Sequence, residues 1–416
     1  QDAFKQASVL LGHSKFSEIN ELTTIIEGNA SDNPDKKIVG SLDDLSRVKL
    51  RMIERVIPGT DRKLSAVRFY PRSKTSDQVF VNKCYKLGKF CEDHNIKIKP
   101  KKEVSRLAQI DFSLLADVAY ESSDELPAIY NLLLWWFDDK YIDELDAKSD
   151  NLELITNYIS QMHAILYADS VEEIDRDDTE LVKIAKQVKT LLIDRQITPQ
   201  NSPGFFERTF ETFNAQLEQA KRKQFQQILT PEEFYSKRLQ FSGVWPSLEL
   251  ALSLLSTNKQ KSTQPIVNNS FIKLLWEKVN WLVSIDNCWD SSIKEIFKEK
   301  DPENYVFVNY VNELISNYPE KIKDKVTDYF DDLDYDLLQG VIKEVADEAN
   351  NLLFEIREML DCFPAEFKDT DKQLALKVGA QWVKALDWSK RTVRYYLDIN
   401  SSKHEQCLMK QRSKSE

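Results

Sequence analysis

Residues 126–144 read LPAIYNLLLWWFDDKYIDE, an apolar stretch that ends abruptly in acidic residues. The periodicity predicts a helix over residues 126–140, and this helix would be apolar on almost every side. A helix of that kind packs in the interior of a protein and not at its surface. The stretch therefore predicts the central helix of a large helical domain.

Four carboxylates follow this apolar run within seven residues, at Asp138, Asp139, Asp143 and Glu144. Like charges this close repel one another, and their burial requires a positive partner. Mg²⁺ prefers oxygen ligands and is held by one or two carboxylates together with phosphate oxygens. A solvated helix end is the ordinary interpretation of an acidic run, but the aromatic run before it weighs against that interpretation.

The composition of the 416-residue chain agrees with a helical fold. Hydrophobic residues make up 42% of the chain, which is enough for a large core. The chain has only nine glycines, and this scarcity disfavours β-sandwich, Rossmann and P-loop folds, whose turns need glycine. Apolar spacing predicts further helices over residues 76–94, 104–120, 151–167, 177–195, 203–226, 231–240, 246–256, 269–299, 302–317, 320–329, 333–361 and 371–397.

The periodic region defines the expected organisation of the chain. Residues 1–68 are polar and rich in turn signals, and we expect an N-terminal extension that is partly helical, with a helix over Leu42–Val56. We expect residues 69–400 to form one helical domain and residues 401–416 to form a flexible tail.

The net charge of −11 excludes a typical nucleic-acid binder, because such binding depends on Lys and Arg that neutralise phosphates. Five cysteines without CxxC spacing favour free thiols in a reducing compartment, so we expect a cytoplasmic protein. No apolar run is long enough to predict a membrane span.

A second polar motif consists of Asn287, Ser291 and Glu295, spaced four residues apart. On a helix these side chains follow one face, and their oxygens suit one Mg²⁺. Lys294 lies beside them and could reach a phosphate. An ordinary polar stripe is the alternative interpretation.

Two further segments carry groups that bind phosphate well. Arg394 and Tyr395 offer a guanidinium fork and a hydroxyl, and Arg238 lies 49 residues before Asn287. Taken alone, the segment of Arg394 and Tyr395 is better explained as a surface basic turn with a packed Tyr, and that of Arg238 as an ordinary helix end before Gly243.

Taken in order, these motifs resemble those of the class I terpene synthases of the microbial type. The resemblance covers residues 69–400 and consists of DDxxxD/E, a later N-x3-S-x3-E with Lys before Glu, an upstream Arg and a late Arg–Tyr pair. It implies a single all-α bundle around a central apolar pocket, and a carbon–oxygen lyase that acts on phosphates. The chain is also similar in length to octocoral and other animal relatives of this family.

The resemblance implies three Mg²⁺ ions when diphosphate is bound, with Mn²⁺ as a possible substitute. The implied metal ligands are Asp138, Asp139, Asp143, Asn287, Ser291 and Glu295, with Asp138 as the chief ligand for two ions. The implied diphosphate-binding residues are Arg238, Lys294, Arg394 and Tyr395. The sequence departs from the family pattern at Cys288, where Asp is usual, and at Phe234, where Tyr is common.

The implied reaction ionises a linear prenyl diphosphate, with geranylgeranyl diphosphate favoured over farnesyl diphosphate, and cyclises the carbocation to a terpene. Aromatic faces stabilise such cations, and the candidate walls are Phe112, Trp135, Trp281 and Trp388, although such residues are more often plain core. A chain-elongating prenyltransferase and a non-catalytic helical interaction protein stay open as alternatives. Family members are often homodimers, so we expect a homodimer here.

Overall fold

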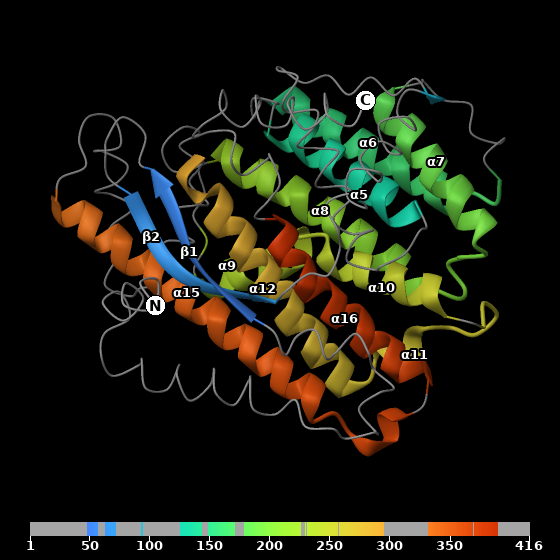
Figure 1. Ribbon diagram of the computed structural model, residues 1–416. Coiled ribbons are helices and arrows are strands. Elements are labelled where there is room, and N and C mark those ends of the chain that lie inside the picture. Colours follow the sequence, from blue (N-terminus) through green and yellow to red (C-terminus); the bar gives the residue numbers. More distant parts are fainter. Residues whose placement is uncertain are drawn as a thin grey trace, which may run out of the picture.

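The computed structural model describes residues 48–56, 63–71, 93–94, 125–143, 149–170, 179–225, 229, 231–256, 258–294, 332–368 and 370–389 (Figure 1). The described elements are β1 (Val48–Val56), β2 (Lys63–Pro71), α5 (Leu126–Phe137), η3 (Asp138–Asp143), α6 (Ser149–Tyr167), α7 (Glu180–Asp194), α8 (Pro203–Phe225), α9 (Pro231–Phe241), α10 (Val244–Leu255), α11 (Gln264–Val267), α12 (Ser270–Lys294), α15 (Asp332–Asp361), η6 (Ala365–Lys368) and α16 (Thr370–Ser389). Most of these residues are helical, so the all-α prediction is confirmed, with one small hairpin added to it.

The predicted central helix is present as α5. Its first turn contains Pro127, where the missing backbone N–H has no helical partner to lose. Every side chain from Leu126 to Phe137 is buried except that of Trp135. Phe137 meets Phe213 of α8 edge to face, with ring centroids 5.0 Å apart. Burial on all sides is what an apolar helix without a polar face requires.

The buried side chains form two clusters. The first, here called the α5–α8 core, is built by α5, α6, α7 and α8. The second, here called the α12–α16 core, is built mainly by β2, α10, α12, α15 and α16. Helix α10 joins the two, because Leu250 belongs to the first cluster while Leu248 and Leu252 belong to the second.

The predicted helix over Leu42–Val56 is wrong where the structure describes it. Residues 48–56 form strand β1, which pairs antiparallel with β2 in the register Val48↔Pro71 to Val56↔Lys63. β-branched residues such as Val48, Ile53 and Val56 suit a strand as well as a helical stripe, and pairing with β2 decides between the two.

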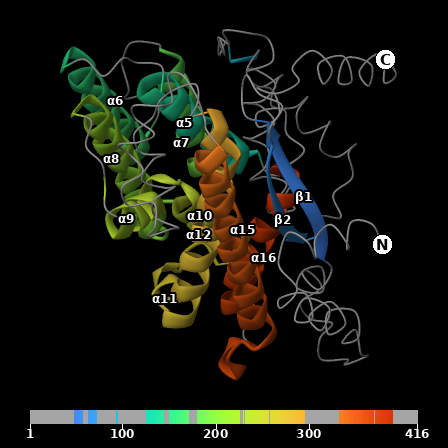
Figure 2. The same ribbon diagram turned by 90° about the vertical axis from the view of Figure 1, so that its left-hand side faces the viewer.

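The hairpin belongs to the helical domain, although the predicted boundary at residue 68 falls inside β2. Leu64, Ala66, Phe69 and Tyr70 of β2 are part of the α12–α16 core. Figure 2 shows the hairpin on the side of the molecule opposite to α6 and α8. The extension therefore contributes directly to the fold, at least through residues 63–70.

The other predicted helices divide into two groups. Those over 151–167, 177–195, 203–226, 231–240, 246–256, 269–299, 333–361 and 371–397 correspond to α6, α7, α8, α9, α10, α12, α15 and α16, with shifted ends. Those over 104–120, 302–317 and 320–329, nearly all of 76–94, and the tail lie outside the described residues. In the part of the chain that was described, every helix is too short or too polar to cross a bilayer.

Candidate active site

The acidic motif lies on a π-helical turn, η3, that continues α5. In an α-helix, positions 138 and 143 would be separated by about 140° around the axis. A π turn is closed by bonds between residues i and i+5, so it brings these two backbone positions to the same side. Tyr141 holds the turn against α6, with its ring centroid 4.5 Å from that of Tyr158. The backbone therefore suits a shared ligand for the two acidic positions.

Helix α8 links the acidic motif to α9. Gln216 Nε2 lies 3.5 Å from Asp138 Oδ1, at the long limit of a hydrogen bond. One turn earlier, Thr212 Oγ1 donates to the carbonyl of Gln240, near the end of α9, at 3.0 Å. Because residues four apart share a helix face, the same face of α8 contacts both elements.

Helix α9 in turn contacts the second predicted metal motif. Arg238 Nη2 donates to Asn287 Oδ1 of α12 at 2.6 Å. Both side chains are half-buried, and the guanidinium of Arg238 also lies 4.7 Å from the ring centroid of Phe241. Two predicted site residues that are 49 positions apart in the sequence are thus in direct contact.

A sharp interruption between helices α9 and α10, here called the α9–α10 break, lies beside this contact. Gly243 has a φ of 71°, a left-handed conformation that glycine adopts without a steric penalty. Asn280 of α12 is fully buried and holds the break from the other side. Its Nδ2 donates to the carbonyl of Leu239 at 2.8 Å, and its Oδ1 accepts from Ser242 Oγ at 2.6 Å.

The remaining predicted polar residues are only partly described. Asp139 and Asp143 lie at backbone positions in η3, and Ser291 and Lys294 lie in α12, but their side chains are outside the description. Glu295, Arg394 and Tyr395 lie entirely outside the described residues. Their predicted roles stay predictions.

The aromatic candidates show different environments. Trp281 is buried in the α12–α16 core, where its Nε1 donates to Glu348 Oε1 at 2.7 Å. Trp135 is half-buried against the α5–α8 core. Trp388 lies at a backbone position of α16, and Phe112 lies outside the described residues.

The described side chains fit a divalent cation and an anionic ligand. Asp138 and Asn287 offer the hard oxygen atoms that Mg²⁺ prefers. Arg238 Nε is a buried donor that has no hydrogen-bond partner among the described residues, and Gln216 Oε1 is a buried acceptor in the same situation. Among the side chains that the structure describes, no three His, Cys, Asp or Glu residues form a cluster, but those of Asp139, Asp143 and Glu295 are not among them.

Sequence reasoning did not find Gln216, Thr212 or Asn280. Each is a polar residue within an amphipathic helix, and such residues normally face solvent. Only the packing of α8 and α12 against their neighbours turns these side chains toward the predicted site residues.

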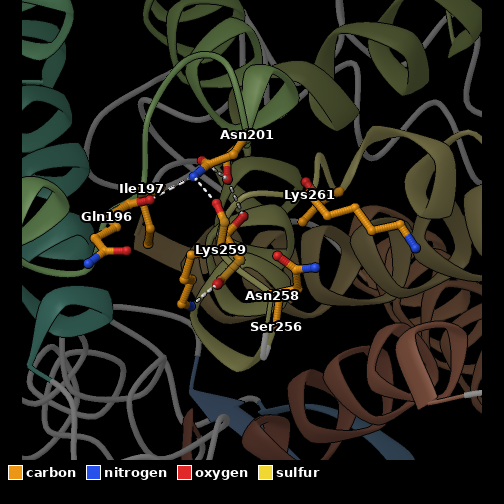
Figure 3. A pocket seen from close by; sticks show the side chains of 10 residues that line it. Gln196, Ile197, Asn201, Ser256, Asn258, Lys259 and Lys261 are labelled. Carbon is orange, nitrogen blue, oxygen red and sulfur yellow. Dashed lines mark hydrogen bonds between the residues drawn. The ribbon is translucent and has the colours of Figure 1, made fainter.

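A small pocket lies away from these contacts (Figure 3). It is lined by the loop before α8 and the loop after α10, including Asn201, Lys259 and Thr263. Asn201 Nδ2 donates to the carbonyl of Lys259 at 2.7 Å, which ties the two loops together. Ser202, also in its lining, is 14 residues before Gln216, so about 20 Å of helix separates the pocket from Asp138. The pocket is therefore not part of the candidate site.

Residues 130–333 match the family model described as terpene synthase family 2, C-terminal metal binding. The matched range begins in α5 and ends at the start of α15, so it contains the acidic motif, Arg238 and the second motif. No curated protein sequence matches the chain significantly.

Three solved structures with the same fold come from Streptomyces species. The 2-methylisoborneol synthase of Streptomyces coelicolor, in complex with Mg²⁺ and 2-fluoroneryl diphosphate, matches with a TM-score of 0.58 and 11% identity over 82% of this chain and 98% of that one. The linalool/nerolidol synthase of Streptomyces clavuligerus, in complex with 2-fluorogeranyl diphosphate, matches with a TM-score of 0.51 and 13% identity over 82% and 100%. The germacradien-4-ol synthase of Streptomyces citricolor gives 0.52 and 13% over 75% and 94%.

At these identities the solved structures establish the fold, while the family model covers the metal-binding region itself. The described part of the chain therefore has the fold of the microbial class I terpene synthases, and residues 130–333 match the metal-binding domain of terpene synthase family 2.

Proposed function

We propose that this chain uses divalent cations to ionise a linear prenyl diphosphate, releases diphosphate, and cyclises the carbocation to a terpene. Geranylgeranyl diphosphate is the favoured substrate and farnesyl diphosphate the next, an order that rests on the resemblance to octocoral enzymes. The observation that carries the proposal is the 2.6 Å bond between Arg238 and Asn287. It joins a diphosphate-binding candidate to a metal-ligand candidate.

The acidic turn and α12 would together hold the cations. The proposed ligands are Asp138, Asp139, Asp143, Asn287, Ser291 and Glu295. Mg²⁺, or Mn²⁺ in its place, supplies positive charge that stabilises the departing diphosphate. Three ions are proposed, because the resemblance to the family implies three Mg²⁺ ions when diphosphate is bound. The Streptomyces coelicolor synthase was solved in complex with Mg²⁺ and 2-fluoroneryl diphosphate, which supports a divalent cation and a prenyl diphosphate as ligands of this fold.

Arg238 has two parts in this scheme. Its Nη2 orients the amide of Asn287 through the bond already formed. Its buried Nε, which has no partner among the described residues, can donate to a diphosphate oxygen. Lys294, Arg394 and Tyr395 are proposed to complete the diphosphate-binding set.

The apolar end of the substrate needs a cavity that excludes water. A carbocation in such a cavity is stabilised by aromatic faces and protected from capture by water. Trp135, Trp281, Trp388 and Phe112 are proposed wall residues. Dimerisation and a cytoplasmic location stay predictions from the sequence.

The direct test incubates the full chain and Mg²⁺ with geranyl, farnesyl, geranylgeranyl and geranylfarnesyl diphosphates. Diphosphate release is measured, and products are identified by gas chromatography. We expect cyclic terpenes from a single substrate, and loss of activity when EDTA removes the metal. Diphosphate release from none of the four substrates would disprove the proposal. Longer prenyl diphosphates formed only with added isopentenyl diphosphate would indicate chain elongation instead.

Arg238→Ala and Asn287→Ala test the hydrogen bond between Arg238 and Asn287, on which the proposal depends. We expect each to lower kcat/KM by about 100-fold or more, because each removes a group that acts on the leaving diphosphate or its cation. Ser236→Ala, at an exposed position on the same helix, is the matched control and is expected to leave kcat/KM unchanged.

A further inference from the structure

A buried arginine of the hairpin contacts the helix that carries the second metal motif. Arg68 of β2 and Asp286 of α12 are each only 2% exposed. Arg68 Nη2 donates to Asp286 Oδ1 at 2.8 Å, and the hydroxyl of Tyr70 donates to the same oxygen at 3.2 Å. Arg68 Nη1 also donates to the carbonyl of Ala346 and to Asn350 Oδ1 of α15, at 3.3 and 3.4 Å. Several partners satisfy this buried ion pair, as its burial requires.

Asp286 directly precedes the metal-ligand candidate Asn287. The two positions are about 100° apart around the axis of α12, so they face different neighbours. Arg68 holds Asp286 from the hairpin, and Arg238 holds Asn287 from α9. Two guanidinium groups on different elements therefore fix the orientation of α12 where the second motif begins.

The hairpin is itself held in register by α15. Gln339 pairs with the backbone of Ser65, accepting from its N–H at 2.9 Å and donating to its carbonyl at 2.5 Å. Asn350 accepts from the N–H of Phe69 at 2.9 Å and donates to the carbonyl of Val67 at 3.0 Å. These two amides bond the backbone of β2 much as a neighbouring strand would. The guanidinium therefore has a fixed place relative to α12.

We propose that Arg68 is a positioning residue for the second metal motif. Through Asp286 it holds α12 at the rotation that presents the Asn287 oxygen to cation and diphosphate. This inference rests on the proposed function, since it assigns Arg68 a part in that same site. Residues that orient metal ligands from outside typically change metal affinity or activity by about 10- to 100-fold when replaced. The hairpin is then part of the active-site architecture.

Arg68 could instead serve only the stability of the fold. Replacement of both Arg68 and Asp286 distinguishes this structural role from the positioning role. Arg68→Met alone would leave Asp286 buried without its cation, which destabilises a fold strongly. Arg68→Met combined with Asp286→Leu removes both charges, keeps the net charge, and substitutes apolar groups of similar size. Such replacement of a buried pair is often neutral for stability.

The test measures binding of inorganic diphosphate in the presence of Mg²⁺ by calorimetry, with thermal unfolding of the free protein alongside. For Arg68→Met/Asp286→Leu we expect binding at least about tenfold weaker than in the unaltered chain, at a similar melting temperature. Lys278→Met/Glu355→Gln is the matched control, since it removes another ion pair between α12 and α15 without touching Asp286 or the hairpin. We expect its affinity for Mg²⁺–diphosphate to be unchanged.

Equal affinity in the double variant and the unaltered chain would overturn the positioning role while leaving the proposed function intact. Failure of the unaltered chain itself to bind Mg²⁺–diphosphate would overturn both. If the double variant does not fold, Arg68→Lys decides the matter. It keeps the charge but loses the planar fork, so weaker binding supports the role and unchanged binding contradicts it.

Discussion

Glu249 of α10 is a buried carboxyl group that the proposed mechanism does not use. It is 1% exposed, and burial raises its pKa to about 7, although a hydrogen bond from Trp245 Nε1 at 2.9 Å and the charge of Arg208 act in the opposite direction. Gly204 of α8 leaves room for this side chain, because an added Cβ would collide with the Glu249 carboxylate. The carboxyl is thus fixed by packing in a place that disfavours its charge.

Glu249→Gln is therefore expected to change the pH dependence of stability. The folded pKa of about 7 lies above the ordinary value of 4.5 for a glutamate, so the folded state retains a proton that the unfolded state loses. The free energy of unfolding consequently falls as pH rises from about 4.5 to about 7, by up to about 3 kcal/mol, and then levels off. The Gln variant should lack this fall in urea unfolding at pH 5 and pH 8. Glu153→Gln, an exposed position on α6, controls for net charge; parallel profiles for all three proteins would contradict the prediction.

At the scale of elements, the break between α9 and α10 brings the two motif-bearing regions together. Gly243 approaches Leu134 of α5, and Leu134 lies one helical turn before Asp138. Asn280 and Thr212 bond the carbonyls of Leu239 and Gln240 from α12 and α8. A distortion of the α9–α10 break would therefore displace residues near both motifs.

Gly243→Ala tests the conformation of this break. The left-handed φ of 71° costs a non-glycine residue about 1–2 kcal/mol, and the new Cβ would lie 2.8 Å from Leu134 Cδ1. We expect a destabilisation of at least that size, together with lower activity. Gly340→Ala in α15 is the matched control, because nothing described lies within 4 Å of its Cβ position. There the same substitution should stabilise by about 0.5–1 kcal/mol. Equal effects in thermal unfolding would refute the prediction.

At the scale of the whole molecule, the hairpin joins the N-terminal part of the chain to the α12–α16 core. Leu64, Ala66, Phe69 and Tyr70 are buried there among side chains of α12, α15 and α16. Without β2, this apolar surface would be exposed and Asp286 would lose Arg68. The helices following residue 71 thus depend on residues that precede it.

Removal of residues 1–71 is expected to destabilise the protein. Loss of one partner of a buried ion pair alone costs about 3–5 kcal/mol, and the apolar exposure adds to it. The reference is a chain that begins at Val48 and retains both strands. We expect a markedly lower melting temperature and increased aggregation for the shorter chain, measured by calorimetry and light scattering. Equal melting temperatures would show that the helices fold independently of the hairpin.

Much of the fold could be predicted because helical periodicity is local. The run from Leu126 to Phe137 specifies a buried helix without reference to any other segment. Strand β1 could not be found in this way, since its apolar spacing also fits a helix and its partner β2 decides the outcome. The π turn at η3 was missed for a related reason: a helix signal does not specify whether a turn closes at i+4 or i+5.

The sequence by itself determined the helical class, the central helix α5, and the order of the acidic motif, Arg238 and the second motif, because residue type and spacing along one chain carry that information. Tertiary structure alone decided that Arg238 contacts Asn287, that Gln216 reaches Asp138, and that Arg68 is buried against Asp286. These pairs are 49, 78 and 218 positions apart. Contacts at such separations follow from the packing of whole helices, which no local pattern encodes.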